Sequence, residues 1–383
     1  MTATASGRVR LLYVLNDASF FVTHRLVLAV AAREAGYDVH VALPRDDRAM
    51  APILKEGLPV HVIPLQRAGT NPFIELRTLA ALIRLYRSLK PEIVHHVTAK
   101  PVLYGSLAAR LTGVKGVVNA ISGLGYLFMS PGRLNLWQPL VRSAYKLAFS
   151  HPHSRVILQN PDDSDLFVRS RILQRGQAVL IRGSGVDIKT FVPVPEAPGT
   201  PIVLLPARLL RHKGVLEFVS AARYLRGDGV NARFVLAGGL DVNPSAIGRA
   251  QIESWQADRI VEWWGQCDDM NAVLAKSAIV CLPSYREGLP KAILEAMACE
   301  RAVITTDVPG CREAVRNGDN GILVPAGEWR PLAEAIRVLL DDPELRRKMA
   351  HRGRQRAVEE FRVEIVVGET LQLYRELAPP TAR

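Results

Sequence analysis

Two cationic side chains stand close together where an apolar segment of the sequence ends. Arg208 closes the segment PIVLLPAR, and Lys213 follows five residues later within ARLLRHKG. A guanidinium and an ammonium group at the mouth of a cleft can neutralise two phosphate groups, so the pair is suited to binding a diphosphate. Taken alone, the same residues are also explained by a solvated basic turn.

Two carboxylates lie near the start of a predicted helix further along the chain. The loop SYREGLP, residues 284–290, follows an apolar run and leads into a helix whose first turn suits Pro290. Backbone N–H groups and the helix dipole at such a start favour a bound anion. Seven residues separate Glu287 from Glu295, which places one carboxylate ahead of the helix and the other about a turn inside it. The simpler role of a single glutamate there is to stabilise the dipole.

Alternating strands and helices must position these side chains. In the first half, apolar strand segments occur at residues 8–15, 38–43, 58–65 and 92–97. Helices are expected between them, with Thr23 as the N-cap of the first and Pro72 to Lys90 as a long one. A second series begins at residue 201, with strand segments at residues 201–208, 232–239, 260–265, 278–284 and 302–307. Repeated β-α units of this kind predict an α/β fold with parallel sheets.

The length of 383 residues and the restart of the winding predict two domains. Between the two series lies VPVPEAPGT, residues 192–200, whose three prolines and one glycine are typical of a linker. We expect one domain over residues 1–185 and a second over 186–362, with the C-terminal helix, residues 363–383, returning to the first. Two doubly wound domains that face one another would place the carboxyl ends of both sheets at one cleft.

Composition and charge limit the function classes. The formal net charge is +12, which predicts an anionic partner such as nucleic acid, phosphorylated metabolites or an acidic membrane surface. The four cysteines form no CxxC pair, so we expect reduced structural thiols rather than a metal site. No signal peptide or spanning segment is recognisable, and the protein is expected to be cytoplasmic.

At this point the sequence resembles a known family, the retaining glycosyltransferases of family 4, which have the GT-B architecture and an E-x7-E motif. The resemblance covers nearly the whole chain. Four segments in order support it: GSGVDIKTF, ARLLRHKG, VEWWGQCDDM and EGLPKAILE.

The resemblance implies a role for each matching residue of the second half. Arg208 and Lys213 would bind the diphosphate of a nucleotide-sugar donor, Glu287 the transferred sugar and Glu295 the ribose. The neighbouring loop residues Gly288, Leu289 and Cys267 are further donor-binding candidates. The resemblance also implies a UDP-sugar as substrate, no cofactor and no metal at the reaction centre, and a same-face mechanism in which the leaving diphosphate takes the acceptor's proton.

The first half resembles the branch of the family that extends sugars on a polyprenyl diphosphate carrier in bacterial surface glycan and capsule synthesis. Ser122 and Gly123 are donor-binding candidates there, although the histidine that other members carry near this loop is absent. Lys100 and Thr98, where a strand ends and a helix begins, are candidates for binding the acceptor's diphosphate. His24, next to the expected helix start at Thr23, is a similar candidate.

The sequence between Glu92 and Asp162 contains no acidic residue and seven lysines and arginines. Within it, the apolar segment from Phe128 to Trp137 resembles an exposed loop beside a basic surface. Such a combination favours an anionic bilayer, so we expect a peripheral protein at the inner face of the cell membrane. Aromatic core residues next to a solvated basic face would explain the same pattern.

Three other function classes are alternatives to the transferase interpretation. A nucleotide-sugar epimerase would share the diphosphate site but would need acid-base groups facing the sugar. Nucleic-acid binding would explain the charge, yet no recognition module is found in the sequence. A dinucleotide oxidoreductase lacks its GxGxxG fingerprint. The sequence does not define the sugar, the donor base, the acceptor hydroxyl or the oligomeric state.

Overall fold

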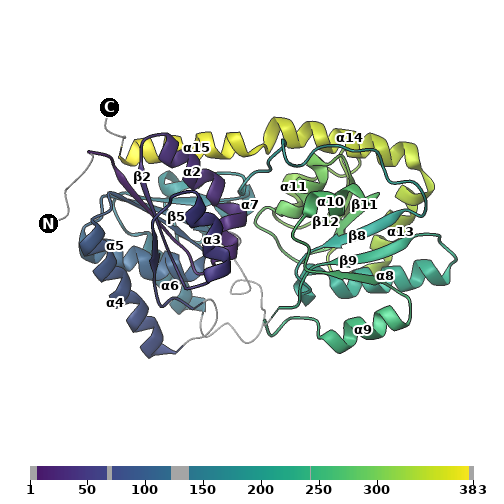
Figure 1. Cartoon of the computed structure of the whole chain (residues 1–383), viewed down its shortest axis with the longest axis horizontal. Coiled ribbons are helices and arrows are strands. Elements are labelled where there is room, and N and C mark those ends of the chain that lie inside the picture. Colours follow the sequence, from purple (N-terminus) through teal and green to yellow (C-terminus); the bar gives the residue numbers. More distant parts are fainter. Residues whose placement is uncertain (1–6, 67–70, 122–137, 242, 379–383) are drawn as a thin grey trace. The chain divides into compact units, whose positions relative to one another are not determined.

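The computed structural model of the chain describes residues 7–66, 71–121, 138–241 and 243–378, apart from the side chain of Gln138 (Figure 1). The chain divides into two compact units, residues 1–184 with 366–383 and residues 185–365. The cleft expected between the two halves stays a prediction. Each unit contains one parallel sheet covered by helices, which confirms the predicted pair of doubly wound α/β domains.

The sheet of the first unit contains seven parallel strands in the order β3-β2-β1-β4-β5-β6-β7. These are β1 (Arg10–Val14), β2 (Asp38–Leu43), β3 (Val60–Val62), β4 (Ile93–Val97), β5 (Gly116–Ile121), β6 (Ser154–Leu158) and β7 (Ala178–Leu180). Strand β4, IVHHV, is buried along its whole length, as expected for a parallel strand covered on both faces. Its two histidines must therefore find hydrogen-bond partners inside the protein.

Helices cover both faces of this sheet. They are α1 (Ala18–His24), α2 (Leu26–Glu34), α3 (Asp47–Lys55), α4 (Pro72–Leu89), the π-helix η1 (Pro101–Gly105), α5 (Ser106–Thr112), α6 (Gln138–Phe149), α7 (Pro161–Arg169) and the short 3-10 helix η3 (Arg175–Gln177). Alternate residues of β1 point to opposite faces. Leu11 and Tyr13 pack with α2 and with the C-terminal helix α15 (Val363–Leu377), whereas Leu12 and Val14 pack with α4 and α5.

The C-terminal helix α15 (Val363–Leu377) contributes to the core of the first unit, where Val366, Leu373 and Tyr374 are buried. The Tyr374 hydroxyl lies 2.8 Å from the Tyr13 hydroxyl and 2.5 Å from Nδ1 of His95. Burial raises the pKa of Tyr13 and of Tyr374 above its ordinary value. The last helix is thus joined to β1 and β4 by polar contacts as well as by apolar packing.

The sheet of the second unit contains six parallel strands in the order β10-β9-β8-β11-β12-β13. These are β8 (Ile202–Pro206), β9 (Arg233–Ala237), β10 (Glu262–Gly265), β11 (Ile279–Leu282), β12 (Ala302–Thr306) and β13 (Ile322–Val324). The helices are η4 (Arg211–Lys213, 3-10), α8 (Val215–Gly227), α9 (Arg249–Ala257), α10 (Met270–Ala275), α11 (Lys291–Ala298), α12 (Cys311–Ala314), α13 (Trp329–Asp341) and α14 (Pro343–Glu360). Val203 and Leu205 pack with α8 and α13, and Leu204 packs with α11.

Two helix starts differ from the sequence prediction. Thr23 was expected to cap the helix that begins near Leu26, which is α2, but the N-cap of α2 is Arg25. Thr23 lies inside a separate helix, α1, which begins after Asp17, whose side chain accepts a hydrogen bond from the Phe20 amide. His24 is consequently the last residue of α1. Pro290 is the N-cap of α11 and not a residue of its first turn.

His96 of β4 is fully buried, and each of its two ring nitrogens has one hydrogen-bond partner, as a neutral ring requires. Nε2 accepts a hydrogen bond from the Tyr86 hydroxyl at 2.9 Å, and Nδ1 donates to Oδ1 of Asn119 at 2.8 Å. Burial lowers the pKa of His96 to about 4, and burial also lowers the pKa of the adjacent His95. Protonation of either ring would place a charge in an apolar core.

We expect the protein to lose stability as the pH falls from 7 to 5. In the unfolded chain His96 titrates near its ordinary pKa of 6.5, so the unfolded state takes up a proton that the folded state cannot hold. The free energy of unfolding should therefore fall by about 1–2 kcal/mol per buried histidine over this range. Urea unfolding at a series of pH values measures it. A His96→Gln variant with an unreduced pH dependence would contradict this assignment.

Candidate active site

The strand order of the second unit defines where a ligand site can form. The chain leaves β8 toward β9 on one side and leaves β11 toward β12 on the other. Loops that diverge from neighbouring parallel strands open a space at the carboxyl ends of the strands, which is where ligands bind in such sheets. The loop after β8 carries Arg208 and Lys213, and the loop after β11 carries Glu287. The fold therefore brings the three predicted residues to one edge of one sheet.

Lys213 and Glu287 form an ion pair between these two loops. Nζ of Lys213 lies 2.5 Å from Oε1 of Glu287, and the two side chains are 19% and 12% exposed. The loops are also joined through their backbones, because the Tyr285 amide donates to the carbonyl of His212 at 2.9 Å. One charged contact and one backbone hydrogen bond thus join two loops whose paired residues, Lys213 and Glu287, are 74 positions apart in the sequence.

Arg208 has a different partner. Its guanidinium donates to Asp241 at 2.8 Å, and the Arg208 side chain is 45% exposed, so it can reach solvent or a ligand. Burial and the positive charge of Lys213 lower the pKa of the intervening His212. His212 therefore adds no positive charge to the loop at neutral pH, and the cations of this loop are Arg208, Arg211 and Lys213.

The loop before α11 is held against the residue that precedes α12. A Cβ atom at Gly310 would overlap the carbonyl oxygen of Gly288 and lie 2.6 Å from that of Glu287. Gly310 also has φ +80°, a conformation that side chains disfavour. Leu289 is buried in the core, so it can offer a ligand only its backbone. These contacts fix the position of the Glu287 backbone.

Glu295 lies in the middle of α11 and is almost fully buried. Burial raises the pKa of its carboxyl group, and the Lys291 ammonium, 3.4 Å away, opposes that shift. Cys267, in the loop after β10, is half-buried, and burial raises the pKa of its thiol. The described contacts do not join either residue to the Lys213–Glu287 pair directly.

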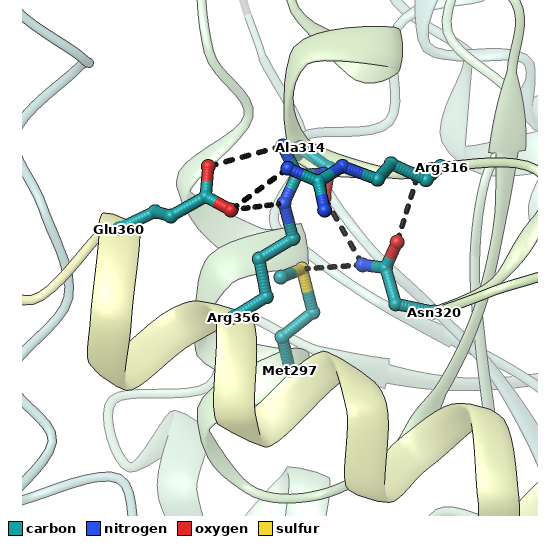
Figure 2. A network of polar contacts seen from close by, with 6 residues as sticks. All are labelled: Met297, Ala314, Arg316, Asn320, Arg356 and Glu360. Carbon is teal, nitrogen blue, oxygen red and sulfur yellow. Dashed lines mark hydrogen bonds and ion pairs between the residues drawn. The ribbon is translucent and has the colours of Figure 1, made fainter.

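A polar network on the far side of α11 supports this helix (Figure 2). Asn320 donates to Sδ of Met297 and to the carbonyl of Ala314, and Arg356 of α14 donates to the same carbonyl. Arg356 is in turn paired with Glu360 at 3.0 Å. Since Met297 follows Glu295 by two residues, the network ties the C-terminal half of α11 to α14.

The first-half candidates fall into three groups. Ser122 and Gly123 lie outside the described residues, as does the segment from Phe128 to Trp137. Thr98 directly follows β4, has φ +75° and donates to Oδ1 of Asn16 at 2.9 Å, and Nζ of Lys100 lies 2.5 Å from Glu75. His24 stacks on Phe20 as the last residue of α1 and directly precedes Arg25, the N-cap of α2.

Four site residues were missed by sequence reasoning. These are Asp241, Lys291, Gly310 and Gly238, at which a Cβ atom would overlap the carbonyl oxygen of Ala207 in the loop after β8. The spacing of Lys291 and Glu295, four residues on one helix, was a readable signal. The other three depend on loops that meet only in the folded chain.

Two findings concern metals and membranes. Within the part of the chain that the structure describes, no cluster of three or more His, Cys, Asp or Glu side chains could hold a metal ion. None of the described helices has both the length and the apolar character needed to cross a membrane.

Comparison with known proteins identifies the class. Residues 187–356 match the family described as glycosyl transferases group 1, and residues 10–160 match the family described as glycosyl transferase 4-like. A Campylobacter jejuni relative, the N,N'-diacetylbacillosaminyl-diphospho-undecaprenol alpha-1,3-N-acetylgalactosaminyltransferase, is 30% identical over 375 residues, which cover 94% of this chain and 97% of the relative. The capsular polysaccharide biosynthesis glycosyltransferase CapM of Staphylococcus aureus is 24% identical over 354 residues, which cover 89% of this chain and 90% of CapM.

Structural comparison agrees with this. Anabaena HepE in complex with UDP and glucose has a TM-score of 0.77 at 19% identity, covering 96% of this chain and 99% of that one. The chain therefore belongs to the group 1, family 4-like glycosyltransferases with the GT-B fold. Within that family it is homologous to bacterial enzymes of undecaprenyl-diphosphate-linked glycan and capsule synthesis. These comparisons give no support to the epimerase alternative.

We expect Gly310→Ala to impair nucleotide binding as well as stability, because its Cβ would displace the Glu287–Gly288 backbone. Gly318→Ala is the matched control, since Gly318 has φ +79° but has open space around the added Cβ. Backbone strain alone should cost both variants about 1 kcal/mol of unfolding free energy. Affinity for a nucleoside diphosphate, measured by calorimetry, should fall about tenfold or more only in Gly310→Ala. Equal affinities in the two variants would contradict the expected role of Gly310.

Proposed function

We propose that the protein transfers a sugar, with retention of anomeric configuration, from a UDP-sugar to a saccharide carried on a polyprenyl diphosphate. The observation that carries the donor half of the proposal is the Lys213–Glu287 pair at the diverging loops of β8 and β11. The acceptor half is supported by the name of the Campylobacter jejuni relative, whose substrate is a diphospho-undecaprenol. UDP is supported by its presence in the similar Anabaena structure.

The donor diphosphate would bind to the two cations in place of the carboxylates that contact them. Arg208 and Lys213 are each paired with one carboxylate, Asp241 and Glu287. A diphosphate offers both cations stronger, charge-assisted hydrogen bonds, since a guanidinium and an ammonium match phosphate oxygens well. Glu287, released from Lys213, would then accept hydrogen bonds from hydroxyl groups of the sugar.

The remaining second-unit candidates would hold the nucleoside. Glu295, whose buried carboxyl is neutralised in part by Lys291, would accept hydrogen bonds from the ribose hydroxyls. The loop of Cys267 would lie against the base, and backbone groups of Gly288 and Leu289 would contact the diphosphate. Such contacts outside the reacting bond use binding energy to orient the donor.

In the chemical step, the acceptor hydroxyl would approach the anomeric carbon from the same face of the sugar that the diphosphate leaves. The acceptor hydroxyl oxygen forms a bond to the anomeric carbon while the bond from that carbon to the β-phosphate oxygen breaks. The leaving phosphate oxygen takes the proton of the acceptor hydroxyl, which gives a nucleoside diphosphate and a retained glycosidic linkage. Arg208 and Lys213 stabilise the negative charge that develops on the diphosphate, the role that a metal ion has in other transferases, so we propose that none is required.

The acceptor diphosphate would bind at the corresponding edge of the first sheet. The order of its strands places diverging loops after β1 and β4. Asn16 is the second residue after β1, and Thr98 is the first after β4. A β-branched residue at φ +75° is strained, and strained residues cluster at functional sites. Lys100 supplies the cation, and Ser122, Gly123 and His24 stay candidates for further contacts. The protein would work at the inner face of the cell membrane and bind no nucleic acid.

The decisive experiment measures nucleoside diphosphate release from a panel of UDP- and GDP-sugars, with and without a polyprenyl-diphosphate-linked saccharide. We expect acceptor-dependent release with one UDP-sugar. Glu287→Gln should lower kcat/KM about 100-fold or more, because it removes the charge of a group that touches the transferred sugar. Glu359→Gln, an exposed glutamate of α14, is the matched control and should retain full activity.

The stereochemistry is read from the anomeric coupling of the purified product by NMR. Retention supports the same-face step, and inversion would refute it. Release that ignores the acceptor, or full activity of Glu287→Gln, would refute the assignment of the transferase site.

A further inference from the structure

Helices α4, α5 and α6 of the first unit lie next to one another, α5 in contact with both α4 and α6 (Figure 1), and all three carry exposed cations. These include Arg77, Arg84, Arg87, Arg110, Arg142 and Lys146. We refer to the exposed surface of these three helices as the basic-apolar face. It is made of described residues and does not depend on the segment from Phe128 to Trp137.

The outward side of α4 shows how this face is built. Phe73, Arg77, Arg84 and Arg87 follow one another at spacings of four, seven and three residues, which places them on one side of the helix. The buried residues Thr78, Leu82 and Tyr86 occupy the opposite side. The exposed arginines are therefore not incidental to the core packing of α4, which uses a different set of residues.

Acidic groups that would balance these charges are missing from the described parts of the three helices. Glu75 is their one acidic residue, and it is ion-paired with Lys100. The next acid in the sequence, Glu92, accepts a hydrogen bond from the Arg10 amide. An unbalanced basic surface repels a second copy of itself and attracts an anionic surface.

Large apolar side chains are exposed on the same face. Phe73 is 84% exposed, Leu76 66% and Leu140 60%, and Leu111 and Leu147 are also exposed. Leu76 also lines a hollow of about 470 Å³. Its other lining residues include Leu79, Leu107, Lys100 and Tyr104. A surface that combines exposed apolar groups with cations is stabilised at a bilayer interface. The aromatic and aliphatic groups enter the boundary of the acyl chains, and the cations contact anionic headgroups.

We propose that the basic-apolar face of α4, α5 and α6 docks the protein on an anionic lipid bilayer. Charge complementarity selects the anionic lipid, and the exposed Phe73, Leu76 and Leu140 select a bilayer over other polyanions. A nucleic acid would use the arginines but would leave these three apolar side chains in water. The inference assigns the membrane contact of the proposed function to a defined surface, and it does not rest on the transfer reaction.

The test is co-sedimentation of the full chain with vesicles of phosphatidylcholine alone or mixed with phosphatidylglycerol. We expect binding only to the mixed vesicles, and weaker binding at higher salt concentration. The double variant Arg84→Glu/Arg87→Glu should weaken the partition coefficient by at least about 30-fold. Loss of each cation near an anionic surface costs about fivefold in affinity, and the two introduced carboxylates are repelled in addition. Phe73→Ser/Leu76→Ser should weaken it about tenfold.

The matched control is Arg347→Glu/Lys348→Glu on α14 of the second unit, which changes the net charge by the same amount at exposed positions. We expect it to bind vesicles within about twofold of the unchanged protein. An equal loss in the control would show that net charge alone drives binding and would overturn the assignment. Vesicle binding that is unaffected by both face variants, or tighter binding to single-stranded DNA than to the mixed vesicles, would overturn it as well.

A second readout separates this inference from the proposed function. Arg84→Glu/Arg87→Glu should retain the melting temperature and the activity on a water-soluble acceptor with a short prenyl chain, but lose activity on acceptor embedded in mixed vesicles. Vesicle binding by the face in the absence of any transferase activity would support the docking surface while the proposed reaction fails. Equal activity of this variant and the unchanged protein on embedded acceptor would count against docking through this face.

Discussion

The loops that carry Lys213 and Glu287 meet through backbone contacts that leave no space for a side chain. A Cβ atom at Gly214 would overlap the carbonyl of Pro283, and one at Gly310 would overlap that of Gly288. Both glycines also have positive φ values. The approach of three loops at the carboxyl edge of the second sheet therefore requires glycine on both sides of the Glu287 loop, and the position of every charged group in the site follows from it.

The close approach of these loops brings Lys213 and Glu287 together as an ion pair. Lys213 and Glu287 are both mostly buried, and burying two charges costs free energy that their attraction repays only with good geometry. The pair satisfies both charges within the protein. A ligand that separates Lys213 from Glu287 must therefore supply contacts for both groups, phosphate oxygens for the ammonium and hydroxyl groups for the carboxylate.

Much of the fold was predictable from the sequence, because parallel strands buried on both faces are continuous apolar runs. The segments around β4, β8 and β11 are of this kind, and glycine and proline separate them clearly from the helices. Helix starts were less predictable. Thr23 is a good N-cap by type, but it lies inside α1, which Asp17 caps, and local sequence does not decide between two suitable caps.

The candidate site was predictable only in part. Arg208, Lys213, Glu287 and Glu295 could be found because charged residues at strand ends form a pattern in the sequence. Gly310 could not, since its role depends on a carbonyl 22 residues away that meets it only after folding. Asp241 was missed for the same reason, because its pairing with Arg208 joins the ends of two neighbouring strands.

The position of Tyr374 has a consequence for how the chain folds during its synthesis. All core residues of the second unit lie between residues 185 and 365, whereas the core of the first unit includes Val366, Leu373 and Tyr374. The first unit emerges first from the ribosome but lacks part of its core until the final helix has been translated. The second unit can complete its folding before the first, in the reverse of the order in which the two are made.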